Sequence, residues 1–325
     1  MEIDIVATKG INAVRNAFDL SCLAGPSKYH HYKDFYKYYN GEVAAPILTI
    51  FVGGNHEAAN HLRELYYGGW AAPNIYFLGY SGVVNYGGLR IGGFSGIYKR
   101  YDFFKGHYEV PPYSGDTVRS AFHVREYELY KLSLLRKPLD VILSHDWPDV
   151  TSYGDVEKLC ADHPHWKEEI EKGELGCHLY TKLLKSLKPS YWLSGHMHCR
   201  FDATVQHTGD QSTHFIALDK VLPRRPFLDV VSFPEATGPR VLTYDLEWLA
   251  ILRATHQYLN CSMATTVLPK GPEREHRNVE KELQELTARF AGKENALAVP
   301  LNFAMTVEPH RSSVDPRTER PTCLP

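Results

Sequence analysis

The sequence YWLSGHMHCR, residues 191–200, ends an apolar run with two histidines two residues apart. Side chains at this spacing on an extended strand point to the same side, so we expect His196 and His198 to face one shared space. Neutral imidazole is a common ligand of transition metals in proteins, which makes this pair a candidate for metal binding. An H-x-H pair alone is more often two ordinary histidines, so the interpretation needs support from the rest of the chain.

Two further apolar runs end in the same way. APILTIFVGGNH places Asn55 and His56 after a pair of glycines, and LDVILSHDWP places His145 and Asp146 at its end. An amide oxygen combined with imidazole nitrogens suits Mn, Fe or Zn. We therefore predict that Asn55, His145 and His196 bind a divalent metal.

The rest of the pattern indicates a layered α/β fold. Helical spacing follows between the strands, in DTVRSAFHVREYELYKLSLL (residues 116–135, with Ser114 or Asp116 as N-cap) and in CHLYTKLLKSLK (residues 177–188). Polar residues gather at the strand ends, where the sites of such folds lie.

Composition excludes several classes of protein. The 325 residues carry a formal net charge of −2, and no apolar run reaches the roughly 18 residues of a membrane span, so we expect no membrane partner. The six cysteines are scattered without paired spacing, as is typical of reduced thiols. Cys199 should point away from His198 and is not expected to bind metal.

The end of the chain differs from the rest. We expect a main domain over residues 1–252 and a C-terminal region over 253–325, with disorder over the residues from 306 onward, which are rich in Pro, Ser and Arg. Within this region one helix carries a narrow apolar stripe made of Val279, Leu283, Leu286 and Phe290.

Longer motifs resemble a known family. GGNHEAANHLRELYYGGWAAPNIYFLG, RIGGFSGIY, LSHDWP, LKPSYWLSGHMH and FIALDKVLPRRPFL are similar to the RNA lariat debranching enzymes of the calcineurin-like metallophosphoesterase superfamily, from about Ile11 to the neighbourhood of Arg253. The resemblance implies a sandwich of two β-sheets flanked by helices. It also implies metal-dependent hydrolysis of the 2′–5′ phosphodiester of branched intron lariat RNA, in the nucleus.

By the same resemblance, Asn55, His145 and His196 would hold one metal and His198 would help to hold another. His56 would lie beside the scissile phosphate and protonate or stabilise the leaving oxygen.

A segment rich in aromatic and basic residues fits an RNA substrate. By resemblance, residues 97–122 form a lariat-recognition loop in which rings stack on bases and cations contact phosphates. The candidate contacts are Tyr98, Lys99, Arg100, Tyr101, Lys105 and Arg119. Arg224 and Arg225 remain open between an ion pair and a phosphate contact, and the sequence indicates no protein partner.

The chain departs from the family pattern near its start. Lys9-Gly10-Ile11-Asn12 stands where the family has Gly-Asp-Phe-Gln, so Gly10 falls on the aspartate that bridges both metals, and no C-x-H motif precedes it. We expect an exposed sheet edge where the first strand and helix of the family are missing, weak metal binding, and little or no catalysis. The chain would then be a truncated, mis-spliced or degenerate debranching enzyme.

Two alternatives to the enzyme remain open. One is a non-catalytic protein that binds branched RNA through the 97–122 segment. The other is a different phosphoesterase of the same fold, such as a protein phosphatase or a cyclic-nucleotide phosphodiesterase, although no G-D-x-x-D-R-G motif occurs.

Overall fold

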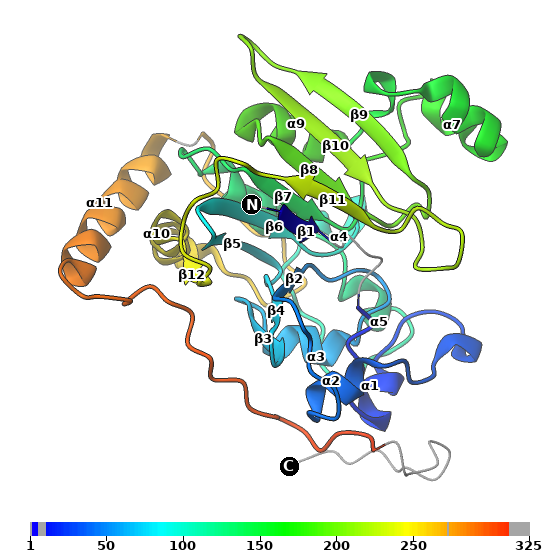
Figure 1. Ribbon diagram of the computed structural model, residues 1–325, viewed down its shortest axis with the longest axis horizontal. Coiled ribbons are helices and arrows are strands. Elements are labelled where there is room, and N and C mark those ends of the chain that lie inside the picture. The colour runs from blue at the N-terminus through cyan, green and yellow to red at the C-terminus, as the bar shows by residue number, and fades with distance from the viewer. Residues whose placement is uncertain (1, 6–10, 272, 312–325) are drawn as a thin grey trace.

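Two β-sheets lie face to face, and helices cover their outer faces (Figure 1). The structure, a computed structural model, describes residues 2–5, 11–271 and 273–311. The layered α/β architecture predicted from the alternation of strands and helices is confirmed.

The larger sheet is mixed. Strands β6, β7, β8 and β10 run parallel to one another, β5 forms an antiparallel hairpin with β6, and β12 and β9 are the antiparallel edge strands. In spatial order its strands are β12 (Thr243–Tyr244), β5 (Ser81–Tyr86), β6 (Leu89–Phe94), β7 (Val141–Ser144), β8 (Tyr191–Ser194), β10 (Ser212–Ala217) and β9 (Phe201–Gln206).

The smaller sheet has three strands. Strand β4 (Ile75–Phe77) lies between β2 (Thr49–Phe51), which is parallel to it, and β3 (Gly69–Ala72), which is antiparallel. Within the described residues β2 pairs with β4 alone, so it is an edge strand. A separate antiparallel pair joins β1 (Glu2–Ile5) to β11 (Asp229–Ser232).

Alternation along the strands divides the core between the layers. On β8, Trp192 packs with the helix-side core, whereas Leu193 packs in the core between the two sheets. On β4, Tyr76 faces the larger sheet, whereas Phe77 packs in a third cluster with Leu62 of a covering helix. Apolar residues on both faces explain why these strands are short continuous apolar runs.

The helices form the outer layers. Helices α6, α9, α10 and α11 cover the larger sheet, and α2 and α3 cover the smaller one. The α-helices are α1 (Ala17–Ser21), α2 (Phe35–Tyr39), α3 (Ala59–Glu64), α4 (Arg100–Phe103), α5 (Thr117–Ser120), α6 (Glu126–Ser133), α7 (Val156–Asp162), α8 (Lys167–Glu171), α9 (His178–Leu187), α10 (Leu246–Thr255) and α11 (Glu273–Phe290). Short 3₁₀ turns are η1 (Ser27–Tyr29), η2 (Thr151–Tyr153), η3 (Pro164–Trp166) and η4 (His256–Tyr258).

The prediction of a single helix over residues 116–135 is wrong. The chain forms α5 and α6 instead, with an extended segment between them. Two residues of that segment pair with Ile97. The carbonyl of Phe122 accepts from the amide of Ile97, and the amide of Val124 donates to the carbonyl of Ile97. This bridge to residue 97 satisfies the backbone groups without a helix.

The C-terminal region packs on the main body. Helix α10 runs through the expected boundary at residue 252, and α11 buries its predicted stripe at Val279 and Leu286. No disulfide joins the five cysteines that the structure describes, and no described helix is long and apolar enough to cross a bilayer.

Residues 299–311, here called the strap, run across the N-terminal helices (Figure 1). The hydroxyl of Tyr39 accepts hydrogen bonds from the amides of Thr306 at 2.7 Å and Val307 at 3.1 Å, and His310 stacks on Tyr32. Residues 306–311 thus lie against the N-terminal helices, and the expected disorder from 306 onward stays a prediction. Contacts with distant residues replace the secondary structure that the local sequence lacks. Residues 312–325 lie outside the described part of the chain.

Replacing Tyr39 with phenylalanine tests this attachment. Tyr39→Phe leaves two strap amides without their acceptor, which we expect to lower the free energy of unfolding by about 1–3 kcal/mol. Hydrogen exchange at residues 306 and 307 should become faster. Tyr38→Phe is the matched control, since the Tyr38 hydroxyl makes no hydrogen bond with described residues. Equal exchange in both variants would contradict the assignment.

Candidate metal centre

Three loops that follow strands β2, β7 and β8 meet at one edge of the sandwich. They carry Asn55, His145 and His196 respectively. The Nε2 atom of His145 lies 2.9 Å from Oδ1 of Asn55 and 3.2 Å from Nδ1 of His196. The structure therefore brings together the three residues predicted to bind one metal, and we call them the metal cluster.

The approach of the β2 loop to His145 requires glycine at position 54. A Cβ atom at Gly54 would lie 2.5 Å from Cε1 of His145, which is closer than any real contact of that kind. Any side chain here would displace either the ring or the loop that carries Asn55. His145 itself is only 2% exposed, so its ring has little room to move.

Hydrogen bonds between the β7 and β8 loops fix the other side of the cluster. The indole of Trp147 donates to the carbonyl of Gly195 at 2.6 Å, and the amide of Gly195 donates to the carbonyl of His145 at 3.2 Å. Trp147 is 1% exposed and packs in the helix-side core. The large sheet and its core thus position both imidazoles.

The spacing within the metal cluster fits one transition-metal ion. Ligand atoms that bind one ion through bonds of about 2.1 Å at tetrahedral or octahedral angles lie about 3.0–3.4 Å apart. The two separations measured from His145 Nε2, 2.9 and 3.2 Å, are close to this range. In the described part of the chain no three His, Cys, Asp or Glu side chains form a metal-binding group, so the cluster depends on the amide oxygen of Asn55.

The histidine pair does not lie on a strand, and the reason given for its shared orientation is wrong. Strand β8 ends at Ser194, and the backbone turns left-handed at His196, with φ of 61°, and at His198, with φ of 58°. The loop conformation, and not strand alternation, directs the His196 ring to His145. Cys199 is 6% exposed and packs in the core, in accordance with the expectation that it is not a ligand.

The proposed roles of His56 and His198 stay predictions. Both side chains are half-buried, and both lie next to the metal cluster in the chain. The carbonyl of His198 accepts a hydrogen bond from Arg225 at 3.4 Å, and Arg225 also forms an ion pair with Asp219 at 2.9 Å. Arg225 is thus engaged in an ion pair, one of the two alternatives left open by the sequence.

Two carboxylates beside the metal cluster were not among the predicted site residues. Asp146 lies 4.0 Å from Nε2 of His196, and it accepts a hydrogen bond from the amide of Tyr98 at 3.3 Å. Glu57 is buried and accepts hydrogen bonds from the amides of Asn12 and Ala13. Burial raises the pKa of Glu57 to about 7, although these two amides oppose the shift. Each adjoins a predicted site residue, Asp146 the ligand His145 and Glu57 the catalytic candidate His56, and that adjacency was the available signal.

Gly10, the position at which the chain departs from the family pattern, lies outside the described residues. The Glu57 carboxylate accepts hydrogen bonds from the amides of Asn12 and Ala13. These bonds hold the turn at residues 12–13 against the loop that carries Asn55. The expected weakness of metal binding stays a prediction.

Most of the predicted RNA-binding residues are exposed. Lys99, Arg100 and Arg119 are exposed, and Tyr101 is 68% exposed. Their role stays a prediction.

Tyr98 and Lys105 are less available than the sequence suggested. Tyr98 packs on the ring of Phe103, with centroids 5.4 Å apart. Lys105 forms an ion pair with the buried Asp102 at 2.8 Å, which raises the pKa of Lys105.

Comparison with known proteins identifies the family of this chain. The family model for calcineurin-like phosphoesterases matches residues 18–200, and the model for the lariat debranching enzyme, C-terminal domain, matches residues 210–324. The chain is 46% identical over 315 residues to lariat debranching enzyme A of Xenopus laevis, covering 94% of this chain and 59% of that protein. Identity to the lariat debranching enzyme of Homo sapiens is 44% over 317 residues, covering 94% and 58%. For the Arabidopsis thaliana enzyme it is 46% over 322 residues, covering 96% and 73%. The chain thus spans less than two thirds of these animal relatives.

Substitution of Gly54 tests the metal cluster. In Gly54→Ala the new Cβ collides with the His145 ring, so we expect affinity for Mn²⁺ or Zn²⁺ to fall by roughly tenfold or more, as measured by calorimetry. Gly115→Ala is the matched control, because a Cβ there meets no atom within 4 Å. Unchanged metal affinity in folded Gly54→Ala would argue against the cluster.

Proposed function

Because this chain belongs to the lariat debranching enzyme family, within the calcineurin-like phosphoesterases, we propose that it hydrolyses the 2′–5′ phosphodiester at the branch point of intron lariat RNA, giving linear RNA. The observation that carries this proposal is the convergence of Asn55, His145 and His196 from three strand ends. An intron substrate implies a role in mRNA processing, and we propose that the protein acts in the nucleus.

The residues of the metal cluster would hold one divalent ion, with Mn, Fe or Zn fitting the mixed nitrogen and oxygen ligands. Such an ion offsets the charge of the phosphodiester and supplies a strong nucleophile near neutral pH. The cluster residues orient the site: the two imidazoles are fixed by the large sheet, and Asn55 is fixed by the contact between Gly54 and His145.

His56 is proposed to act at the leaving oxygen. Hydrolysis breaks the bond between phosphorus and the branch-point 2′ oxygen, which must leave as a hydroxyl and therefore needs a proton. His56 is half-buried and follows Asn55 directly, so it lies on the same loop as one of the proposed metal ligands. Lys99, Arg100 and Arg119 would contact flanking phosphates, and the exposed ring of Tyr101 would stack on a base.

A second candidate function follows from the composition of the metal cluster. The described residues provide two imidazoles and an amide but no carboxylate ligand that would bridge two ions. A protein with such a centre could bind branched RNA through residues 97–122 without cleaving it. This candidate predicts binding that survives a chelator.

Cleavage of a synthetic 2′–5′ branched RNA separates the two candidates. With Mn²⁺ or Fe²⁺ present we expect linear product that is abolished by chelator, and a rate lowered about 10²-fold or more in His145→Ala. His165→Ala, an exposed histidine in η3, is the matched control and should cleave at the wild-type rate. Binding without cleavage by the wild-type chain would favour the non-catalytic candidate.

A further inference from the structure

An aromatic pocket lies beside the metal centre and has no part in the function argued above. It has a volume of about 590 Å³, partly open to solvent, and four separate segments of the chain build it. We call it the aromatic pocket; its walls include Arg63, Tyr66, Tyr67, Tyr80, His107 and Tyr113.

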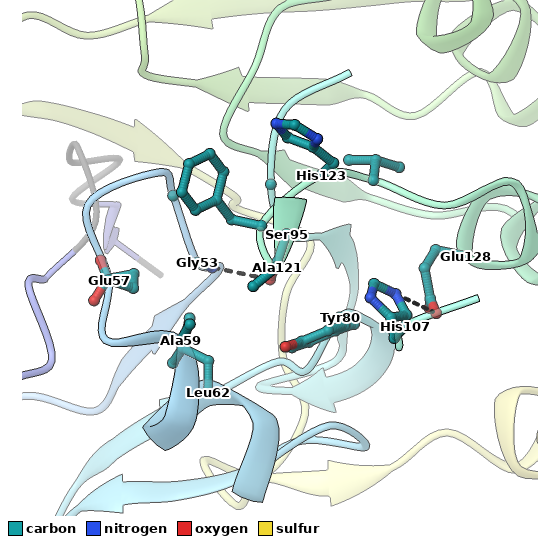
Figure 2. A pocket seen from close by; sticks show the side chains of 14 residues that line it. Gly53, Glu57, Ala59, Leu62, Tyr80, Ser95, His107, Ala121, His123 and Glu128 are labelled. Carbon is teal, nitrogen blue, oxygen red and sulfur yellow. Dashed lines mark hydrogen bonds and ion pairs between the residues drawn. The ribbon is translucent and has the colours of Figure 1, made fainter. Parts of the chain in front are cut away.

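The aromatic pocket is linked to the loop that carries Asn55. A second pocket shares Tyr80 and His107 with it and reaches Gly53 and Gly54, which directly precede Asn55 (Figure 2). Figure 2 shows Tyr80 and His107 close together on one side of this second pocket, with Gly53 farther along it. The second pocket therefore connects the aromatic pocket to the loop that carries Asn55.

The walls present aromatic surfaces packed edge to face. The ring centroids of Tyr66 and Tyr80 lie 4.9 Å apart, and those of Tyr80 and His107 lie 4.6 Å apart with planes at 70°. Tyr67 stands at the mouth and is 49% exposed. The hydroxyls of Tyr67, Tyr80 and Tyr113 make no hydrogen bond with any described residue.

His107 has unused hydrogen-bonding capacity. Both of its ring nitrogens are buried, and neither has a hydrogen-bond partner in the described part of the chain. The nearest charged atom is a Glu128 carboxylate oxygen, 3.6 Å from Nε2, and that carboxylate is already engaged by Tyr66 and Lys131. Burial lowers the pKa of His107, so the ring is neutral and offers one donor and one acceptor.

Buried polar atoms without partners destabilise a fold, and each one calls for an explanation. The His107 nitrogens are such atoms, whereas the three tyrosine hydroxyls are not fully buried. A ligand that is both flat and polar at its edge would supply a partner to His107 and could also hydrogen-bond to the hydroxyls. An unpaired nucleobase has these properties, since its faces stack on aromatic rings and its edge carries donors and acceptors. Arg63 uses one N–H group on the carbonyl of Glu109 and has further donors for a phosphate.

We propose that the aromatic pocket binds one unpaired base of the RNA substrate, with Tyr67 stacking on it and His107 hydrogen-bonding to its edge. This inference rests on the proposed function, because the RNA at the metal cluster is the source of the base. The pocket would hold a nucleotide that flanks the scissile phosphate and so fix the branched RNA in register.

Binding of adenosine monophosphate, measured by NMR titration with chelator present, tests the pocket alone. We expect saturable binding that perturbs the pocket residues, and no such binding of ribose 5-phosphate, which lacks a base. Tyr67→Ala and His107→Phe should each weaken binding about tenfold. Tyr29→Ala, a similarly exposed tyrosine in η1, should leave it unchanged.

The His107→Phe variant also separates a binding role from a structural one. Because the substitution removes two unpartnered buried nitrogens, we expect its melting temperature to equal or exceed that of the wild type while binding falls. Failure of adenosine monophosphate to bind, or binding that neither variant weakens, would overturn the proposal.

The two proposals fail separately. Cleavage of branched RNA without nucleotide binding in the pocket would sink the pocket and leave the enzyme standing. Nucleotide binding by a chain that never cleaves branched RNA would support the pocket and contradict the proposed enzyme activity.

Discussion

The contact between the backbone of Gly54 and the ring of His145 determines the geometry of the metal centre. These residues belong to loops from two different sheets, which can meet only because position 54 has no side chain. Their meeting depends in turn on the core between the sheets, where Ile50 of β2 packs in the same cluster as Val141 and Leu193. The metal cluster is therefore a product of the whole sandwich.

The N-terminal turn and the strap are linked to this centre through shared contacts. Glu57 holds the turn at Ala13, and two residues later the buried guanidinium of Arg15 is held by Asp19 and Glu64. The carbonyl of Arg15 accepts from the amide of His310, at the far end of the strap. Burial would raise the pKa of Asp19, but the hydrogen bond and charge of Arg15 keep this pKa below its usual value. The strap thus stabilises the turn that lies against the loop of Asn55.

Much of this could be predicted from the sequence, and the parts that could are local. The strands ending near Asn55, His145 and His196 are short apolar runs closed by small polar residues. Parallel neighbours in one sheet bring the ends before His145 and His196 together. The strand before Asn55 belongs to the other sheet, so its approach could not be predicted from that rule. What could not be predicted depends on distant partners. The break between α5 and α6 exists because residues 122–124 bridge to Ile97, and the attachment of the strap depends on Tyr39.

The aromatic pocket illustrates the same limit. Its rings come from three separate stretches of the sequence, and nothing near His107 in the chain indicates that its nitrogens lack partners. The left-handed turns at His196 and His198 are similarly invisible in the pattern of residues. The sequence was sufficient to predict which three side chains lie close together, but not the backbone that brings them there.

The most direct test of the account is the coordination of a bound metal ion. X-ray absorption spectroscopy of the chain loaded with Zn²⁺ or Mn²⁺, compared with the Asn55→Ala and His145→Ala variants, reports the ligands without requiring catalysis. The account predicts a shell containing imidazole nitrogens and an oxygen at about 2.0–2.2 Å that changes in both variants. A shell that neither substitution alters would show that the ion binds elsewhere, and would contradict the metal centre on which the proposed function rests.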